Sequence, residues 1–269
     1  AAWTGIILVS VLGDWLAAMA ALPDVPRTLS QALGSKDAKG WQAAADKEYG
    51  ALTERNTWVL VPRPKNRNVV TTKWVFTIKT KADGSFDRFK ARLVARGFTQ
   101  RLGLDYGETY APVGRYATAR VLLALACAMD WEIHVMDVTN AFLYGELEDE
   151  IYMEQPEGYD DGTGRVCLAQ RALCGLKQSP RQWNKKLHEH LLSLGFTASS
   201  FDPALSHRFS THSGVTYLLV FVDVILEVWC SKALLSQLKK DLMAAWDMKD
   251  LGEISYYLGL NVKRDRSQR

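Results

Sequence analysis

Two acidic residues stand at the ends of apolar segments that are typical of buried strands. Asp137 follows IHVM (133–136), and Asp223 follows LVFV (219–222). A carboxylate in such a place is costly unless it is solvated, paired or bound to a metal. Taken singly, each aspartate is more simply explained as a turn residue. Taken together, they could hold two Mg²⁺ ions, which activate an attacking hydroxyl and stabilise a leaving oxygen.

A basic hairpin is the second candidate site. Residues 69–78 and 89–98 are rich in β-branched, aromatic and apolar residues, and residues 82–84 give a turn signal between them. Even spacing puts four cations on one face of the second strand: Arg88, Lys90, Arg92 and Arg96. Three more cations lie on or beside the first strand: Lys73, Lys79 and Lys81. An isolated charge run is usually a solvated surface, but this concentration suits contacts with phosphate.

Two other groupings of residues, and the absence of one motif, give no further candidate site. His188 and His190 with Cys167 and Cys174 match no common zinc spacing, and histidines two apart on a helix point in different directions. The segment GTG (162–164) lacks the third glycine and the strand–helix context of a nucleotide loop, so it reads as a turn. The sequence contains no GxSxG signature of a serine nucleophile.

The elements that would position these residues mix helices and strands without a regular βαβ repeat. Apolar spacing predicts helices over residues 35–55, 121–129, 179–194 and 231–246, the first, third and last capped by Asp37, Ser179 and Ser231. Pro180 suits a first helical turn, and Gly195 a helix end. Predicted strands are 133–138, 216–222 and 225–228. This pattern favours the α+β class over a doubly wound α/β fold.

Composition sets wider limits. The 269 residues are 48% hydrophobic and 23% charged, which excludes disordered, collagen-like and coiled-coil classes. A net charge of +3 neither requires nor excludes a polyanionic partner. The four cysteines contain no CxxC pair, so a reducing compartment is the default.

Residues 1–22 are apolar enough to resemble a membrane span. Asp14 interrupts the run. A secretory signal requires a Lys or Arg before its apolar segment, and none precedes this one. We therefore expect a helical leader and no stable membrane association. Membrane attachment through this segment is the alternative.

Eight sequence blocks, taken in order, resemble the reverse transcriptase of copia-type LTR retrotransposons from about Pro26 to the C-terminus. The blocks are KWVF (73–76), RFKARLVARGFTQ (88–100), DYGETYAPV (105–113), MDVTNAFLYGEL (136–147), IYMEQPEGY (151–159), GLKQSPRQW (175–183), FVDV (221–224) and MKDLGEISYYLGL (248–260). The resemblance implies the fingers and palm of a right-hand polymerase, with an antiparallel palm sheet packed by helices. We expect a leader at 1–25, a fingers-like region at 26–120, a palm-like region at 121–260 and a tail at 261–269.

The resemblance also implies site residues. Asp137 and Asp223 match the catalytic carboxylates that hold two Mg²⁺ ions, or Mn²⁺ in their place. Residues matched to positions that bind the incoming dNTP are Arg88, Lys90, Arg92, Asn140, Ala141 and Phe142. Among these, Phe142 would block a nucleotide 2′-hydroxyl, although composition alone equally suits a core aromatic. Residues matched to the segment beneath the template and primer are Gly175, Lys177, Gln178, Ser179 and Pro180.

Three positions depart from the family pattern. Val224 replaces the third carboxylate, Phe221 replaces a tyrosine, and Cys174 replaces another tyrosine. Glu227 lies beyond the hairpin turn and is not expected to substitute for the missing carboxylate. We therefore expect an RNA-directed DNA polymerase with impaired activity. The alternative is a catalytically dead remnant that still binds nucleic acid.

The implied partners are an RNA or DNA template-primer, dNTPs and other parts of a Gag-Pol polyprotein. The implied location is the cytoplasm, within a virus-like particle, or the nucleus. The template preference and the oligomeric state do not follow from the sequence.

Overall fold

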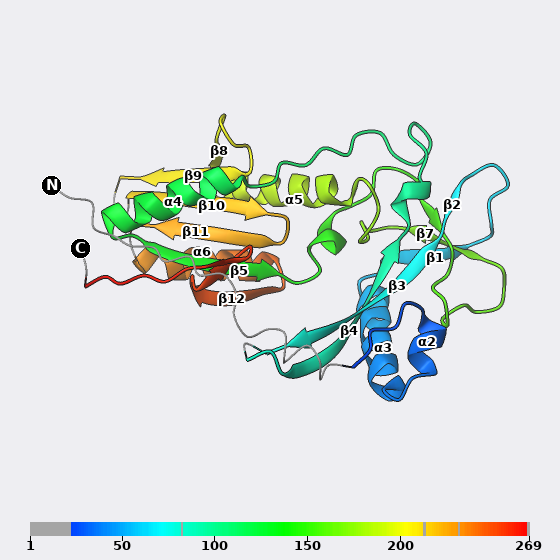
Figure 1. Cartoon of the computed structure of the whole chain (residues 1–269). Helices are drawn as coiled ribbons and strands as arrows, with labels where there is room; N and C mark the ends of the chain where they lie inside the picture. The colour runs from blue at the N-terminus through cyan, green and yellow to red at the C-terminus, as the bar shows by residue number, and fades with distance from the viewer. Residues whose placement is uncertain (1–22, 82, 212–213, 231, 268–269) are drawn as a thin grey trace. The chain divides into compact units, whose positions relative to one another are not determined.

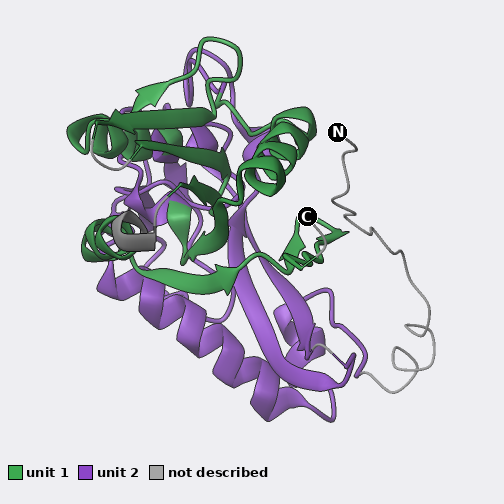
Figure 2. Cartoon of the chain, turned by 90° about the vertical axis from the view of Figure 1, so that its left-hand side faces the viewer, with its two compact units in different colours: residues 1–11, 111–141, 184–269 green, residues 12–110, 142–183 purple. Residues whose placement is uncertain are grey.

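A computed structural model describes residues 23–81, 83–211, 214–230 and 232–267. The chain divides into two compact units, and each is built from segments that are far apart in sequence (Figure 2). Of the described residues, unit 1 takes 111–141 and 184–267, and unit 2 takes 23–110 and 142–183. Each unit is described separately below.

Unit 1 is built around a six-stranded sheet in which every neighbouring pair is antiparallel. In spatial order its strands are β12 (Met248–Glu253), β5 (Glu132–Val138), β11 (Val224–Trp229), β10 (Gly214–Phe221), β9 (Leu205–Ser210) and β8 (Thr197–Ala198). The expected α+β class with an antiparallel sheet is confirmed.

Helices cover both faces of this sheet. Helix α4 (Tyr116–Met129) crosses one face, and α6 (Lys232–Ala245) lies against the other (Figure 1). Side chains alternate between the two faces along a strand, so Leu226 and Val228 of β11 lie on the same face. Both belong to the core cluster that contains the buried residues of α4. A small hairpin of β13 (Tyr256–Tyr257) and β14 (Leu260–Asn261) adds Tyr257 to the same core.

A buried aspartate fixes the start of α4. The N-cap residue, Arg115, makes no side-chain capping hydrogen bond. Asp202, which is 4% exposed, supplies this function from another segment. Its Oδ2 accepts hydrogen bonds from the Arg115 N–H at 3.2 Å and from Thr118 Oγ1 at 2.5 Å. A long-range contact therefore replaces the local cap that sequence reading looks for.

Unit 2 combines helices, a long hairpin and a second sheet. Its helices are α2 (Leu29–Leu33), α3 (Ala38–Glu54) and the short 3₁₀ turn η1 (Gly97–Thr99). The hairpin is β3 (Thr72–Thr80) with β4 (Phe86–Ala95). The sheet runs β1 (Trp58–Val61), β7 (Val166–Ala169), β6 (Tyr152–Met153), β2 (Val69–Val70). Two further elements contain a boundary between the units: η2 (Ala141–Tyr144) and α5 (Ser179–Ser193).

The core of unit 2 is aromatic. Trp74 and Phe76 alternate along β3 and pair with Leu93 and Ala91 of β4, so all four side chains face the same way. Trp41 of α3 packs edge-on against Phe76, with ring centroids 5.4 Å apart. This packing explains why the predicted amphipathic helix and hairpin form together.

The segment 142–183 belongs with the first half of the chain. Its strands β6 and β7 pair with β2 and β1, and Met153 and Cys167 enter the same core cluster as Trp41. The boundary expected near residue 120 assigned this segment to the second region. Pairing between distant strands carries no local sequence signal, which explains the difference.

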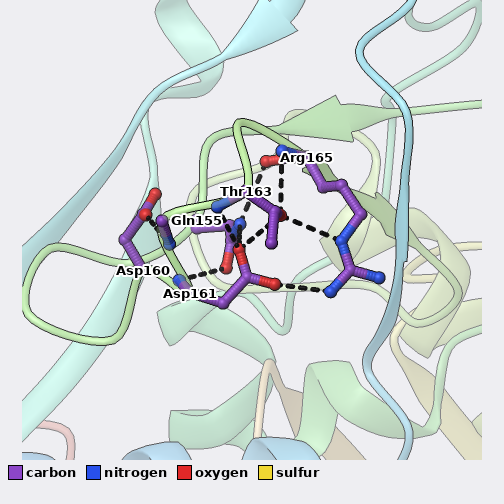
Figure 3. A network of polar contacts seen from close by, with 6 residues as sticks. Gln155, Asp160, Asp161, Thr163 and Arg165 are labelled. Atoms are coloured by element: carbon purple, nitrogen blue, oxygen red, sulfur yellow. Dashed lines mark hydrogen bonds and ion pairs between the residues drawn. The ribbon is translucent and has the colours of Figure 1, made fainter.

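A polar network organises the loop between β6 and β7 (Figure 3). Asp161 accepts hydrogen bonds from Thr163 Oγ1 at 2.6 Å, Gln155 Nε2 at 2.8 Å and Arg165 at 2.5 Å. The Thr163 hydroxyl and the Gln155 amide are the main causes that hold the pKa of Asp161 below its usual range. Gly162 and Gly164 adopt positive φ angles of 72° and 70°, so the GTG segment is a turn.

Two predicted helix caps are wrong in detail, and a third is not described. Asp37 precedes α3 but makes no side-chain capping hydrogen bond. Ser179 is the first residue of α5 and not the residue before it, and its hydroxyl donates to the Leu173 carbonyl at 2.6 Å. Ser231 lies outside the described residues. The predicted stop at Gly195 is confirmed, since α5 ends at Ser193 and Gly195 has φ 80°.

No helix within the described part of the chain is both long and apolar enough to cross a membrane. Of the leader expected at residues 1–25, residues 1–22 lie outside that part.

Candidate active site

Asp137 lies near the end of β5, a central strand of the unit 1 sheet. The residue is half-buried, and its direct partner across the antiparallel β5–β11 pair is Val224. The next residue, Val138, donates its N–H to the Asp223 carbonyl at 2.8 Å. The structure therefore brings Asp137 and Asp223 onto adjacent chain segments, although they are far apart in sequence.

Asp223 occupies a two-residue turn between β10 and β11. The first turn residue, Val222, has φ 58°, which β-branched residues rarely adopt. Such a conformation costs on the order of 1–3 kcal/mol and persists only where the surrounding structure enforces it. Six residue pairs join β10 to β11 and impose the tight turn. The strained turn fixes the place of Asp223 at the hairpin tip.

Asp137 has one direct partner on each neighbouring strand. Lys249 of β12 pairs with Asp137 on one side, and Val224 pairs with it on the other. Directly opposite residues share a face of the sheet, so Lys249, Asp137 and Val224 lie side by side on one face. Lys249 was missed in the sequence analysis. Only the register of β12 against β5 reveals it.

The donor chemistry of the two aspartates fits Mg²⁺, which prefers hard oxygen ligands. Both residues are half-buried on adjacent segments, so they retain access to solvent. Within the described residues, no group of three or more His, Cys, Asp or Glu side chains could hold a metal ion. Val224, which the resemblance matches to a third carboxylate, has no ligand atom.

The segment after Asp137 is held on both sides. Val138 N–H bonds to Asp223, and the Thr139 N–H donates to the Asp247 carbonyl at 2.8 Å. Asn140 then adopts φ 52°, which turns the chain sharply at the end of β5. Ala141 is 5% exposed. Phe142 follows in η2, belongs to unit 2 and is half-buried.

The hairpin in unit 2 carries a basic face, defined here as Lys73, Lys79, Arg88, Lys90 and Arg92. These residues alternate with the buried side chains of β3 and β4. Lys79 lies directly opposite Arg88, and like charges in such pairs are destabilising. Arg96, expected on the same face, is the first residue after the end of β4 and is left out of this definition.

Acidic neighbours partly neutralise this basic face. Arg88 forms an ion pair with Asp87 at 2.9 Å. Burial raises the pKa of Glu48 on α3, while Arg92 and Lys90 pull it down. The cations near Glu48 are therefore not simply solvated charges.

The segment Gly175–Pro180 lies against the end of β4. The Ala95 N–H donates to the Cys174 carbonyl at 2.8 Å. A Cβ at Gly97 would lie 2.0 Å from the Gly175 carbonyl oxygen, and a Cβ at Gly175 would lie 2.1 Å from the Ala95 carbonyl oxygen. Neither position can accept a side chain without movement of the backbone. These two glycines allow the backbones to approach closely.

Comparison with known proteins identifies the relatives of this chain. A family model described as reverse transcriptase (RNA-dependent DNA polymerase) matches residues 55–268. The chain is 42% identical over 252 residues to the retrovirus-related Pol polyprotein from transposon RE1 of Arabidopsis thaliana, covering 93% of this chain and 17% of that protein. It is 37% identical over 246 residues to the corresponding polyprotein from transposon TNT 1-94 of Nicotiana tabacum, covering 91% and 18%.

A third relative, the Pol polyprotein from transposon RE2 of Arabidopsis thaliana, is 41% identical over 244 residues, covering 89% of this chain and 16% of the relative. The chain thus spans about a sixth of the length of these curated relatives. The match extends over most of the chain and includes both candidate aspartates. This chain belongs to the reverse transcriptase (RNA-dependent DNA polymerase) family, as the copia-type domain of a retrotransposon Pol polyprotein.

Proposed function

We propose that this domain descends from an enzyme that extends a primer on an RNA or DNA template, consuming a dNTP and releasing pyrophosphate, and that its own activity is impaired. The observation that carries the proposal is the placement of Asp137 and Asp223 on adjacent segments at one end of the unit 1 sheet. Unit 1 then corresponds to the palm. Unit 2 contributes the fingers.

Each candidate residue has a task in this reaction. Asp137 and Asp223 would hold two Mg²⁺ ions, or Mn²⁺ in their place. When bound, such ions activate the primer 3′-hydroxyl and neutralise charge on the phosphates. The strained turn at Val222 and the Val138–Asp223 hydrogen bond fix the aspartate backbones beforehand. Preorganised groups of this kind need no rearrangement during the reaction.

Other residues would bind the nucleotide. Arg88, Lys90 and Arg92 present cations that suit the triphosphate. The turn at Asn140 and Ala141 would offer backbone N–H groups to phosphate oxygens. Phe142 would exclude a 2′-hydroxyl and so favour deoxynucleotides.

A specific observation favours the second candidate, a catalytically dead remnant that binds nucleic acid. Val224 sits directly opposite Asp137, where the family pattern has a carboxylate. Glu227, three residues later, is 0% exposed, and neither carboxylate oxygen has a hydrogen-bond partner. Val224 offers no ligand atom beside Asp137, and Glu227 is an unpaired acid in the core, where its burial costs stability.

Primer extension tests the two candidates. The chain, its Val224→Asp variant and the double variant Val224→Asp/Asp137→Asn are assayed with Mg²⁺ and with Mn²⁺ on RNA and DNA templates. The polymerase proposal expects extension by Val224→Asp that Asp137→Asn abolishes. Binding of template-primer by all three without any extension would favour the remnant, and absence of binding would contradict both.

The wider partners are also proposals. We infer that the domain acts within a Gag-Pol polyprotein or its products, on the nucleic acid of the element. That work would take place in a cytoplasmic virus-like particle or in the nucleus. No stable membrane association is expected.

A further inference from the structure

Exposure divides the segment Gly175–Pro180 into two sets of residues. Gly175 is exposed, and Lys177 and Pro180 are half-buried. Gln178 and Ser179 are 1% and 0% exposed. The sequence analysis assigned the whole segment to the template and primer side, yet these last two side chains point into unit 2.

Both side-chain amide hydrogens of Gln178 are donated to other residues of unit 2. Its Nε2 donates to the Asp105 carbonyl at 2.9 Å and to Asp149 Oδ2 at 3.1 Å. Its Oε1 accepts a hydrogen bond from Gln100 Nε2 at 3.0 Å. An amide group has two N–H donors, so none remains for a ligand.

The partners of Gln178 are themselves anchored. Gln100 is 5% exposed, and its Oε1 accepts the Lys177 N–H at 2.8 Å. Asp105 is 2% exposed, and its Oδ2 accepts from Asn68 Nδ2 at 2.6 Å and from the Arg101 N–H at 2.8 Å. Buried polar groups that are fully satisfied hold one conformation, because breaking any bond leaves an unpaired group.

The outer side of the segment carries a cation. Lys177 Nζ lies 3.1 Å from the Tyr106 hydroxyl and 4.8 Å from the centre of its ring. These contacts orient the side chain of Lys177, a residue that is only half-buried. A positioned cation that is not fully buried is suited to a phosphate contact.

We propose that Gln178 and Ser179 are positioning residues, which Gln100 and Asp105 anchor from inside unit 2, and that Lys177 with the exposed backbone at Gly175 contacts the template-primer phosphates. The inference rests on the proposed function, since it divides the labour within the segment assigned to template and primer. It changes the role of Gln178 from ligand contact to internal support.

A double-mutant cycle tests this division. Template-primer affinity is measured by fluorescence anisotropy for Gln178→Leu, Gln100→Leu, the double variant and Lys177→Ala. Each glutamine substitution should weaken binding roughly tenfold, the effect of one lost buried hydrogen bond. The double variant should bind about as weakly as either single variant, because both changes break one network. Gln170→Leu, an exposed glutamine in the same unit, is the matched control and should bind normally.

Lys177→Ala has a different signature. Loss of one phosphate contact should lower the slope of log affinity against log salt by about one, whereas the glutamine variants should keep the slope. Multiplicative losses in the double variant, or an unchanged slope for Lys177→Ala, would overturn the inference. Multiplicative losses would mean that Gln178 acts independently of Gln100, as a direct contact would, and an unchanged slope would mean that Lys177 contacts no phosphate.

Hydrogen–deuterium exchange separates this inference from the proposed function. Gln100→Leu should speed deuterium uptake by the peptide that contains Lys177, whose N–H loses its acceptor, with or without nucleic acid. If the unsubstituted chain binds no template-primer, the proposed function fails while this exchange result still stands. Unchanged uptake in Gln100→Leu would show that the network does not hold the segment.

Discussion

Val224 faces Asp137 directly across the β5–β11 pair, so an aspartate at this position would have its Cβ about 4.5–5.5 Å from that of Asp137. A third carboxylate would then join Asp137 and Asp223 at one end of the sheet. Val224 is half-buried, so the new charge would remain partly solvated. Because Val224 packs against the core cluster under α4, the substitution also gives up some apolar contact, which costs on the order of 1 kcal/mol.

We expect Val224→Asp to raise Mg²⁺-dependent primer extension by roughly 10²-fold or more, because each missing ligand removes several kcal/mol of transition-state stabilisation. Single-turnover extension measures the gain. Val224→Asn is the matched control, since it has a similar shape and a neutral amide that is a poorer ligand. Equal activity of the two variants would argue that the carboxylate is not the missing element.

Glu227 is a buried acid whose ionisation should affect folding stability. It lies in the middle of β11, between Leu218 of β10 and His134 of β5. Burial raises its pKa to about 8, although Lys239 of α6 opposes this shift and Asp250 of β12 adds to it. Lys239 instead bonds Asp250 Oδ1 at 2.6 Å and lies 2.9 Å from His134 Nδ1.

The shift makes folding stability depend on pH. An unfolded chain ionises Glu227 near pH 4.5, whereas the folded chain holds the proton up to about pH 8. The free energy of unfolding should therefore fall as pH rises between these values, by about 2 kcal/mol from pH 6.5 to 8. Urea unfolding across this range measures the slope.

Glu227→Gln should flatten this dependence, and Glu227→Leu should also raise the free energy of unfolding, because it removes the buried polar group. Glu189→Gln, at an exposed glutamate of α5 in the same unit, is a control that should leave the slope unchanged. A Glu227→Gln variant with the original slope would mean that other groups titrate in this range.

At the scale of elements, close approach between β4 and the segment that begins at Gly175 should be the least tolerant feature of unit 2. Gly97→Ala would place a Cβ 2.0 Å from the Gly175 carbonyl, so the two backbones must separate. We expect a loss of at least about 2 kcal/mol in the free energy of unfolding. Gly107→Ala is the matched control, because nothing lies within 4 Å of its added Cβ. Equal stability of the two variants would contradict this account.

The basic face of the β3–β4 hairpin is partly balanced by Glu48 of α3, which interacts with Arg92 and Lys90. Glu48→Gln should free these cations and strengthen dNTP binding about two- to threefold, the usual strength of a partly exposed ion pair. Glu54→Gln removes the same charge from an exposed position on the same helix and should have no effect. Isothermal titration compares the two variants. Equal gains would indicate only a net-charge effect.

At the scale of the whole molecule, local pattern predicted the four longer helices, the basic hairpin and three strands of the unit 1 sheet, but it did not predict β1, β6, β7, β9 or β12. Apolar runs gave β5, β10 and β11 within two residues, and the apolar run of α4 gave its C-terminal end. The cap that Asp202 supplies to α4, the pairing of Lys249 with Asp137 and the return of residues 142–183 to unit 2 had no local signal. Each depends on residues brought together only by folding.

The residues of the candidate site were likewise predicted only in part. The two aspartates stood out because a charge at the end of an apolar strand is unusual. Gln100 and Asp105 lay inside recognised blocks but received no role, because a buried amide network cannot be read from residue types. Gln178 received a contact role that its burial does not support.

The charge distribution of the chain leads to the last prediction. A net charge of +3 is too small to give strong salt dependence by itself, so steep dependence must come from a local surface such as the basic face. Charge reversal at Lys79 and Arg88 together should lower the salt slope of template-primer binding by about two. Reversal at Lys36 and Lys39, two exposed lysines of the same unit, changes the net charge equally and should leave the slope unchanged. Asp137→Asn should bind as tightly as the unsubstituted chain, because phosphate contacts do not depend on catalysis. If both double reversals lower the slope equally, binding follows net charge, and the hairpin is not the nucleic-acid surface.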